Sequence, residues 1–128
     1  HVYMKWDVEG TDEFTFWFLN LDLADRSKVT IAIERLEEGG PGLGRPWVDT
    51  LKGSRHTNMK ELRPREGNLR VFFAFDPRRS AILLIGGDKT NRWQTFYTDM
   101  IPRADDLYDD YLDELKGEGR GQRAEGSA

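Results

Sequence analysis

Residues 69–89 read LRVFFAFDPRRSAILLIGGDK, and this stretch decides the fold. Every second side chain across residues 69–75 is apolar, which predicts a strand with one wholly apolar face and with Arg70 on the other. Residues 81–85 are an unbroken aliphatic run, which is typical of a central strand covered on both faces. Residues 76–80 supply a turn, so the two strands should be antiparallel neighbours.

Further strands are expected on the N-terminal side of this pair. Residues 59–63 predict a third strand, which the turn at 64–67 joins to the central pair as an antiparallel meander. A short extended piece is expected around residues 48–51, within the loop 43–54. The alternation over residues 4–9 predicts a first strand.

Three helices complete the pattern. Thr11 and the two acidic residues after it predict the start of a first, very apolar helix. A second helix is expected over residues 25–38, whose apolar residues recur at i, i+4 and i+7, and the glycines and proline of 39–42 end it. Pro102 is expected to open the last helix. The small and polar residues 117–128 predict a disordered tail.

This order of elements predicts one α+β domain over residues 1–116. The 128 residues include no cysteine and two histidines, which excludes a disulfide framework, a thiol nucleophile and a zinc centre. We therefore expect neither a metal site nor a cofactor. The longest aliphatic run is far shorter than the roughly 20 residues of a membrane span, and no export leader opens the chain, so we expect a cytoplasmic protein.

The net charge of −4 conceals a strongly polarised chain. Residues 1–44 carry 4 Lys or Arg against 9 Asp or Glu, residues 45–92 carry 11 against 5, and residues 93–128 carry 4 against 9. The three segments therefore have net charges of −5, +6 and −5. A basic middle segment can form a positive face that attracts phosphate, although ordinary solvated charges can cluster in the same way.

Several phrases, taken in their order, carry a resemblance to a known family. They are GRPWVDTLKGSRH (44–56), NMKELR (58–63), LRVFFAFD (69–76) and AILLIGGDK (81–89), followed by a helix that begins IPRAD (101–105). With these phrases the chain resembles the RelE/ParE superfamily of toxins, in particular its HigB-like, phage-derived Gp49-like branch. The phrases and the helix together cover most of residues 2–116.

The resemblance implies the RelE-like fold, a small twisted antiparallel sheet with two N-terminal helices packed on one face and a C-terminal helix. It also implies a toxin of a type II toxin–antitoxin system, an mRNA endoribonuclease that inhibits translation by cutting mRNA on the ribosome without a metal ion. The implied partners are the ribosome, mRNA and a cognate HigA-like antitoxin with a helix-turn-helix domain. The aspartates of the last helix are either a solvated face or a surface that repels ribosomal RNA or binds this antitoxin.

Metal-free RNA cleavage needs a base for the 2′-hydroxyl, cations for the phosphate and an acid for the leaving 5′-oxygen. Arg70 matches the strand arginine that binds the scissile phosphate in RelE-like enzymes, and Arg63 could lie across from it. Lys89 matches a basic residue at the exit of the central strand. Tyr97 lies near the place of a tyrosine that stacks on the nucleotide or transfers protons. These four residues are the expected catalytic set, with surface charge and a plain core aromatic as the alternatives.

Five further residues are expected to bind RNA: Lys52, His56, Lys60, Arg92 and Trp93. Trp93 can stack on a base, and His56 is either a general base or a solvated loop residue. The same fold also supports a ParE-like toxin that poisons DNA gyrase without nuclease chemistry, or an inactive binding module. The convergence of the four catalytic candidates around the basic segment favours the nuclease.

Overall fold

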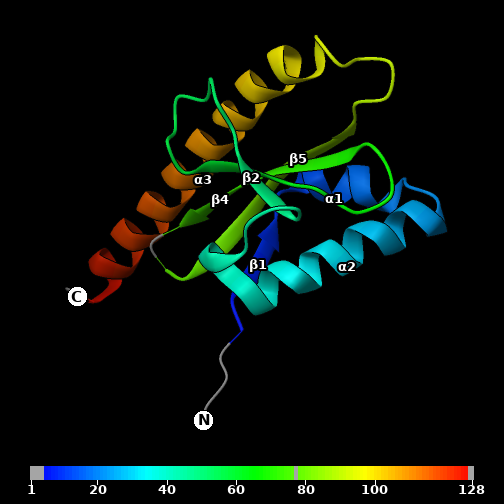
Figure 1. Cartoon of the computed structure of the whole chain (residues 1–128). Helices are drawn as coiled ribbons and strands as arrows, with labels where there is room; N and C mark the ends of the chain where they lie inside the picture. Colours follow the sequence, from blue (N-terminus) through cyan, green and yellow to red (C-terminus); the bar gives the residue numbers. More distant parts are fainter. Residues whose placement is uncertain (1–4, 77, 127–128) are drawn as a thin grey trace.

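The computed structural model describes the backbone of residues 5–76 and 78–126, and the side chains as far as Gly117. Figure 1 shows one sheet with helices on both of its faces. The strands, in the spatial order β1-β5-β4-β3-β2, are β1 (Asp7–Gly10), β2 (Val48–Thr50), β3 (Met59–Leu62), β4 (Leu69–Asp76) and β5 (Ser80–Asp88). The expected α+β class is confirmed. Met4, which the sequence places in the first strand, lies outside the described residues.

The central pair β4 and β5 is antiparallel, as the sequence predicts. Alternate residues of β4 contribute to different halves of the core: Val71 and Phe73 face helices α1 and α2, whereas Phe72 and Ala74 face helix α3. The expected separation of the two faces of this strand is therefore confirmed, and it places Arg70 on the α3 side.

The sheet is mixed rather than wholly antiparallel. Strand β1 pairs parallel with β5, from Asp7 opposite Ser80 to Gly10 opposite Leu83, while the other three pairings are antiparallel. The long connection between β1 and the rest of the sheet allows a parallel pairing, which a tight hairpin does not. The expectation of a purely antiparallel sheet is corrected at this edge.

Helices α1 (Asp12–Leu19) and α2 (Leu23–Gly39) cover one face of the sheet, as expected for the two N-terminal helices. The Thr11 side chain caps α1 by accepting a hydrogen bond of 3.0 Å from the amide of Phe14, which confirms the predicted helix start. A short 3-10 turn, η1 (Gly40–Gly42), follows α2.

Helix α3 (Phe96–Gly126) covers the opposite face (Figure 1). It begins six residues before Pro102, so the expected start at this proline is wrong. The ring of Phe96 is fully buried against Phe72, which holds the first turn on the sheet. The sequence predicts a helix start at Pro102 because proline is common at the first position of a helix. Proline also occurs inside helices, at the cost of one backbone hydrogen bond.

The helix continues to Gly126, whereas the sequence predicts a disordered tail over 117–128. Glycines alternate in this segment with Glu, Arg, Gln and Ala, which favour helix, and no proline interrupts it. Within the described residues, no helix is both long and apolar enough to cross a membrane.

Gly87 fixes how closely α3 approaches the sheet. It lies opposite Arg70 in the β4–β5 ladder, and a Cβ atom here would come within 2.9 Å of the Phe96 ring. The absent side chain therefore allows the first turn of α3 to lie directly on β5. This contact brings Tyr97 close to Lys89, which directly follows the last residue of β5.

Candidate functional site

Arg70 is a buried cation on the α3 face of β4. Its side chain is almost enclosed, with the residue 6% exposed. Its Nη1 atom donates hydrogen bonds to the carbonyls of Leu69 (2.8 Å) and Gly67 (3.4 Å), while its buried Nε atom has no hydrogen-bond partner in the described part of the chain. A buried guanidinium with an unused donor is costly for stability, which marks it as a candidate functional group.

Glu61 and Arg63 lie beside Arg70. Glu61 is part of β3, and Arg63 directly follows the last residue of this strand. Glu61 lies opposite Phe72, and continuing this register by two residues places Arg63 opposite Arg70. The Arg63 Nε atom is 3.7 Å from the Glu61 Oε1 atom. The second carboxylate oxygen of Glu61 is buried and finds no hydrogen-bond partner among the described residues.

Two further residues complete this group. Lys89 directly follows β5, and Tyr97 lies in the first turn of α3. The Lys89 Nζ atom donates a 3.4 Å hydrogen bond to the Tyr97 hydroxyl. Burial lowers the pKa of Lys89 below its ordinary value, and the nearby charges of Arg70 and Arg63 lower it further, against the opposite effect of Glu61. Burial, and then the carboxylate of Glu61, raise the pKa of Tyr97. Tyr97 is therefore a neutral proton donor near pH 7, and it is poorly suited to act as a base.

We call these five residues the cationic cluster: Glu61, Arg63, Arg70, Lys89 and Tyr97. Three cations face one carboxylate, so the cluster has an excess of positive charge on a largely enclosed surface. It combines donors for phosphate oxygens, a carboxylate that can accept a proton and two groups that can release one. All four residues of the expected catalytic set are thus brought together.

Trp93 and Arg92 lie at the outer edge of the cluster. The Lys89 Nζ atom lies 4.9 Å from the centre of the Trp93 ring, and this ring is mostly exposed. Arg92 donates a 2.9 Å hydrogen bond to Asp99 and packs over Phe96. Trp93 is therefore available to stack on a base beside the cluster, whereas the charge of Arg92 is already paired.

Lys60 is not part of this site. It lies opposite Phe73 in the β3–β4 ladder and therefore shares the face covered by α1 and α2, on the far side of the sheet from Arg70. Its Nζ atom donates to the Thr50 hydroxyl at 3.3 Å. Because side chains of a strand alternate between faces, neighbours in sequence such as Lys60 and Glu61 point in opposite directions.

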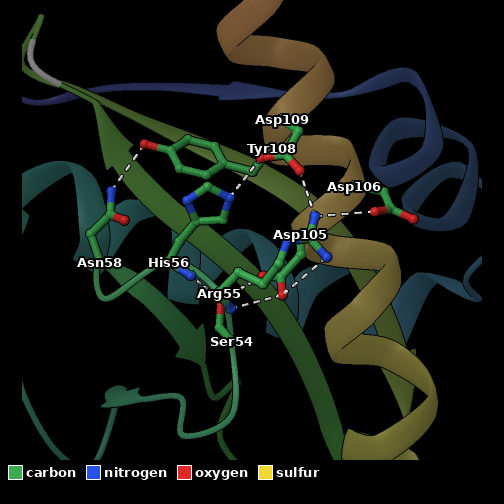
Figure 2. Close-up of polar contacts among 8 residues, drawn as sticks. All are labelled: Ser54, Arg55, His56, Asn58, Asp105, Asp106, Tyr108 and Asp109. Carbon is green, nitrogen blue, oxygen red and sulfur yellow. Dashed lines mark hydrogen bonds and ion pairs between the residues drawn. The ribbon is translucent and has the colours of Figure 1, made fainter.

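His56 belongs to a second polar group, which links the loop 51–58 to α3 and which we call the clasp: Ser54, Arg55, His56, Asp105, Asp106 and Asp109 (Figure 2). The His56 Nε2 atom lies 2.8 Å from an Asp109 oxygen, and its ring packs edge-on against Tyr108. A histidine held in this way is an anchor of the loop. The partners of its ring are therefore Asp109 and Tyr108 rather than a member of the cationic cluster.

Asp105 is the buried centre of the clasp. It is 2% exposed and accepts hydrogen bonds from the Ser54 hydroxyl and, at 2.9 Å, from the amide of Arg55. The guanidinium of Arg55 in turn binds Asp106 and Asp109 (Figure 2). The sequence pattern predicts that all the aspartates of this helix lie on its outer side. Asp105 is an exception because it shares a buried stripe with Ile101, at i+4.

Sequence reasoning missed Glu61 as a site residue. The signal was present, since an acidic residue interrupts a strand whose neighbours Met59 and Leu62 are buried. Lys52, by contrast, is exposed in the loop 51–58 and lines a hollow that Tyr97 also lines. It lies beside the cationic cluster without belonging to it.

Comparison with known proteins identifies the family of the chain. The profile of the family described as "Phage derived protein Gp49-like" matches residues 16–109. HigB3 of Mycobacterium tuberculosis is 48% identical over 103 residues, a match that covers 80% of this chain and 90% of HigB3. HigB2 of the same organism is 47% identical over 109 residues, which covers 83% of this chain and 53% of HigB2. The chain thus spans about half the length of HigB2.

Solved structures show the same fold. A mutant of the Escherichia coli toxin RelE in the free state matches with a TM-score of 0.58 and 12% identity, over 78% of this chain and 98% of RelE. A chain of the RelE–RelB complex of Pyrococcus horikoshii matches with a TM-score of 0.55 and 17% identity. The match covers 67% of this protein and 97% of the Pyrococcus chain. The chain therefore belongs to the phage-derived Gp49-like family, the HigB-like branch of the RelE-fold toxins.

Proposed function

We propose that this protein is the toxin of a type II toxin–antitoxin system and inhibits translation by cutting mRNA on the ribosome without a metal ion. The observation that carries the proposal is the cationic cluster, in which Arg70 and Glu61 each keep a buried polar atom without a partner. Such atoms are expensive in a purely structural role. They are expected where a substrate supplies the missing partner.

The cluster offers a group for each step of the reaction. The 2′-oxygen attacks the adjacent phosphorus as its proton passes to the Glu61 carboxylate, and the bond to the 5′-oxygen breaks. The products are a 2′,3′-cyclic phosphate and a 5′-hydroxyl. Arg63 and Arg70 neutralise the additional negative charge on the phosphate oxygens, because the guanidinium fork matches their geometry.

The leaving 5′-oxygen takes its proton from Lys89 or Tyr97, which share a hydrogen bond. The lowered pKa of Lys89 makes its proton easier to release, and Tyr97, kept neutral by its raised pKa, orients the ammonium group by accepting its hydrogen bond. Substrate reaches the cluster from the surface past Arg63 and Lys89, both of which are partly exposed. Trp93 is placed to stack on a neighbouring base.

The partners follow from the same proposal. A cognate HigA-like antitoxin with a helix-turn-helix domain would hold the protein inactive, and the ribosome would present the mRNA to it in the cytoplasm. The solved relatives support an antitoxin partner, since the Pyrococcus horikoshii RelE structure is a complex with RelB.

Primer extension on a reporter mRNA, in a cell-free translation reaction, tests the proposal. Wild type should create new 5′ ends in register with codons, and Arg70→Ala should reduce them by about 10² to 10³-fold, the cost of losing one donor to the transition state. Arg35→Ala is the matched control, because Arg35 lies on α2 across the sheet. Intact mRNA at protein levels that stop growth would overturn the proposal in favour of gyrase or another protein target.

A further inference from the structure

A hollow of about 480 Å³ opens between the loop 51–58 and the first turns of α3. Its size falls in the range of pockets that hold a small ligand or a single nucleotide. Its lining combines apolar, hydroxyl, basic and acidic groups: Lys52, Arg55, Tyr97, Thr98, Ile101, Pro102 and Asp105. It lies on the same side of the sheet as Arg70, because α3 covers that side.

The basic wall of the hollow carries a cation that is free to bind an anion. Lys52 is exposed and makes neither a hydrogen bond nor an ion pair within the described residues. Arg55 is different, because the clasp already pairs it with Asp106 and Asp109 (Figure 2). Asp105, which also lines the hollow, is bound by the Ser54 hydroxyl and the Arg55 amide, so Lys52 is the cation of this wall that has no partner among the described residues.

The helical wall of the hollow carries an exposed hydroxyl group. Thr98 and Pro102 both line the hollow, and the Thr98 side chain is exposed. Ile101 and Pro102 supply apolar surface beside this polar group. A flat heterocycle with N–H donors at its edge matches this combination.

The clasp holds the two walls together. Asp105 lines the hollow and binds Ser54 and the backbone of Arg55, so the loop cannot move away from α3 without breaking these bonds. The hollow is therefore formed before any ligand binds, which reduces the entropic cost of binding. Tyr97 lines the hollow on one side and bonds Lys89 of the cationic cluster on the other.

We propose that this hollow binds one nucleotide of single-stranded RNA, the one next to the phosphate held in the cationic cluster. Its base lies on Ile101 and Pro102 and donates an N–H to the Thr98 hydroxyl. Its backbone phosphate lies at Lys52. The inference rests on the proposed function for the identity of the neighbouring site, and it adds a position at which the sequence of the RNA is read.

Binding of an uncleavable RNA tests the subsite separately from the nuclease. The probe is a fluorescein-labelled mixed-sequence hexanucleotide with 2′-methoxy groups, which lack the attacking hydroxyl, and the readout is anisotropy at several salt concentrations. Lys52→Ala should weaken binding and reduce the slope of log K against log salt by about 0.7, the loss of one phosphate contact on a single strand. Lys60→Ala, on the other face of the sheet, should leave the slope unchanged.

A second variant fills the hollow without changing charge. Thr98→Trp, at an exposed helix position, should weaken binding by roughly tenfold, as expected for the loss of one seated base. Circular dichroism and melting establish that it folds. In the cell-free reaction, the nucleotide preference around the cut should change in this variant.

The outcomes separate the two proposals. Loss of binding in Lys52→Ala and Thr98→Trp, with Lys60→Ala unaffected, supports the subsite even if wild type proves not to cut mRNA. Binding of the hexanucleotide by all three variants with the affinity of wild type overturns the subsite. Cleavage of mRNA by wild type would still uphold the nuclease in that case. A wild type that does not bind the hexanucleotide at low salt also overturns the subsite.

Discussion

The clasp and the cationic cluster use similar side chains on the same face of the sheet, but they differ in how fully their polar atoms are paired. In the clasp, the buried carboxylate of Asp105 binds a hydroxyl and a backbone amide, and Arg55 binds two further aspartates. In the cluster, Arg70 and Glu61 are equally buried, yet each keeps one atom without a partner. Complete pairing is expected of a structural device, and incomplete pairing of a site that awaits a ligand.

Replacing Glu61 should give the largest difference between activity and stability. Glu61→Gln keeps the size of the side chain and removes its capacity as a base, so mRNA cleavage should fall by about 10² to 10⁴-fold. The melting temperature should fall, because the neutral amide no longer offsets the positive charges of Arg63, Arg70 and Lys89. Cleavage rates and thermal melts on the same preparation provide the measurement.

Glu66→Gln is the matched control, since Glu66 is exposed in the turn before β4. Undiminished cleavage by Glu61→Gln would show that the carboxylate is not the base. A lowered melting temperature together with undiminished cleavage would show that Glu61 is structural, and the comparison between cluster and clasp would then be wrong.

Removing the buried carboxylate at the centre of the clasp should act mainly on stability rather than on mRNA cleavage. Asp105→Ala leaves the Ser54 hydroxyl and the Arg55 amide without their acceptor, which costs about 1 to 3 kcal/mol of unfolding free energy. Asp106→Ala should cost less than about 0.5 kcal/mol, because Asp106 is exposed and forms one ion pair. Urea titration measures both. Equal effects for the two variants would contradict the structural role of Asp105.

The sequence predicted the position of Arg70 but not the composition of its surroundings. The side-chain period of two in a strand is a local property, so the pattern of residues 69–75 determines which face Arg70 occupies. The burial of Glu61 depends on its register opposite Phe72, and that register is set by contacts between strands. The start of α3 depends in the same way on the space that Gly87 leaves for Phe96, far from Pro102 in sequence.

The smallest expected effect is a pH dependence in the clasp. Arg55, and then His56, hold the pKa of Asp109 below its ordinary value of 3.8. The folded state therefore binds a proton at this carboxyl less readily than the unfolded chain. The resulting stability is present above pH 3.8 and is lost as the pH falls through the folded pKa.

The variant Asp109→Asn lacks this contribution to stability. Its melting temperature should lie below that of wild type near about pH 6, and the gap should narrow toward about pH 3. Asp113→Asn, on the exposed side of the same helix, controls for the loss of one negative charge. A gap that stays constant across this range would show that the contact with Asp109 is worth the same to its charged and neutral forms, and the negative charge of Asp109 would then add nothing to the clasp.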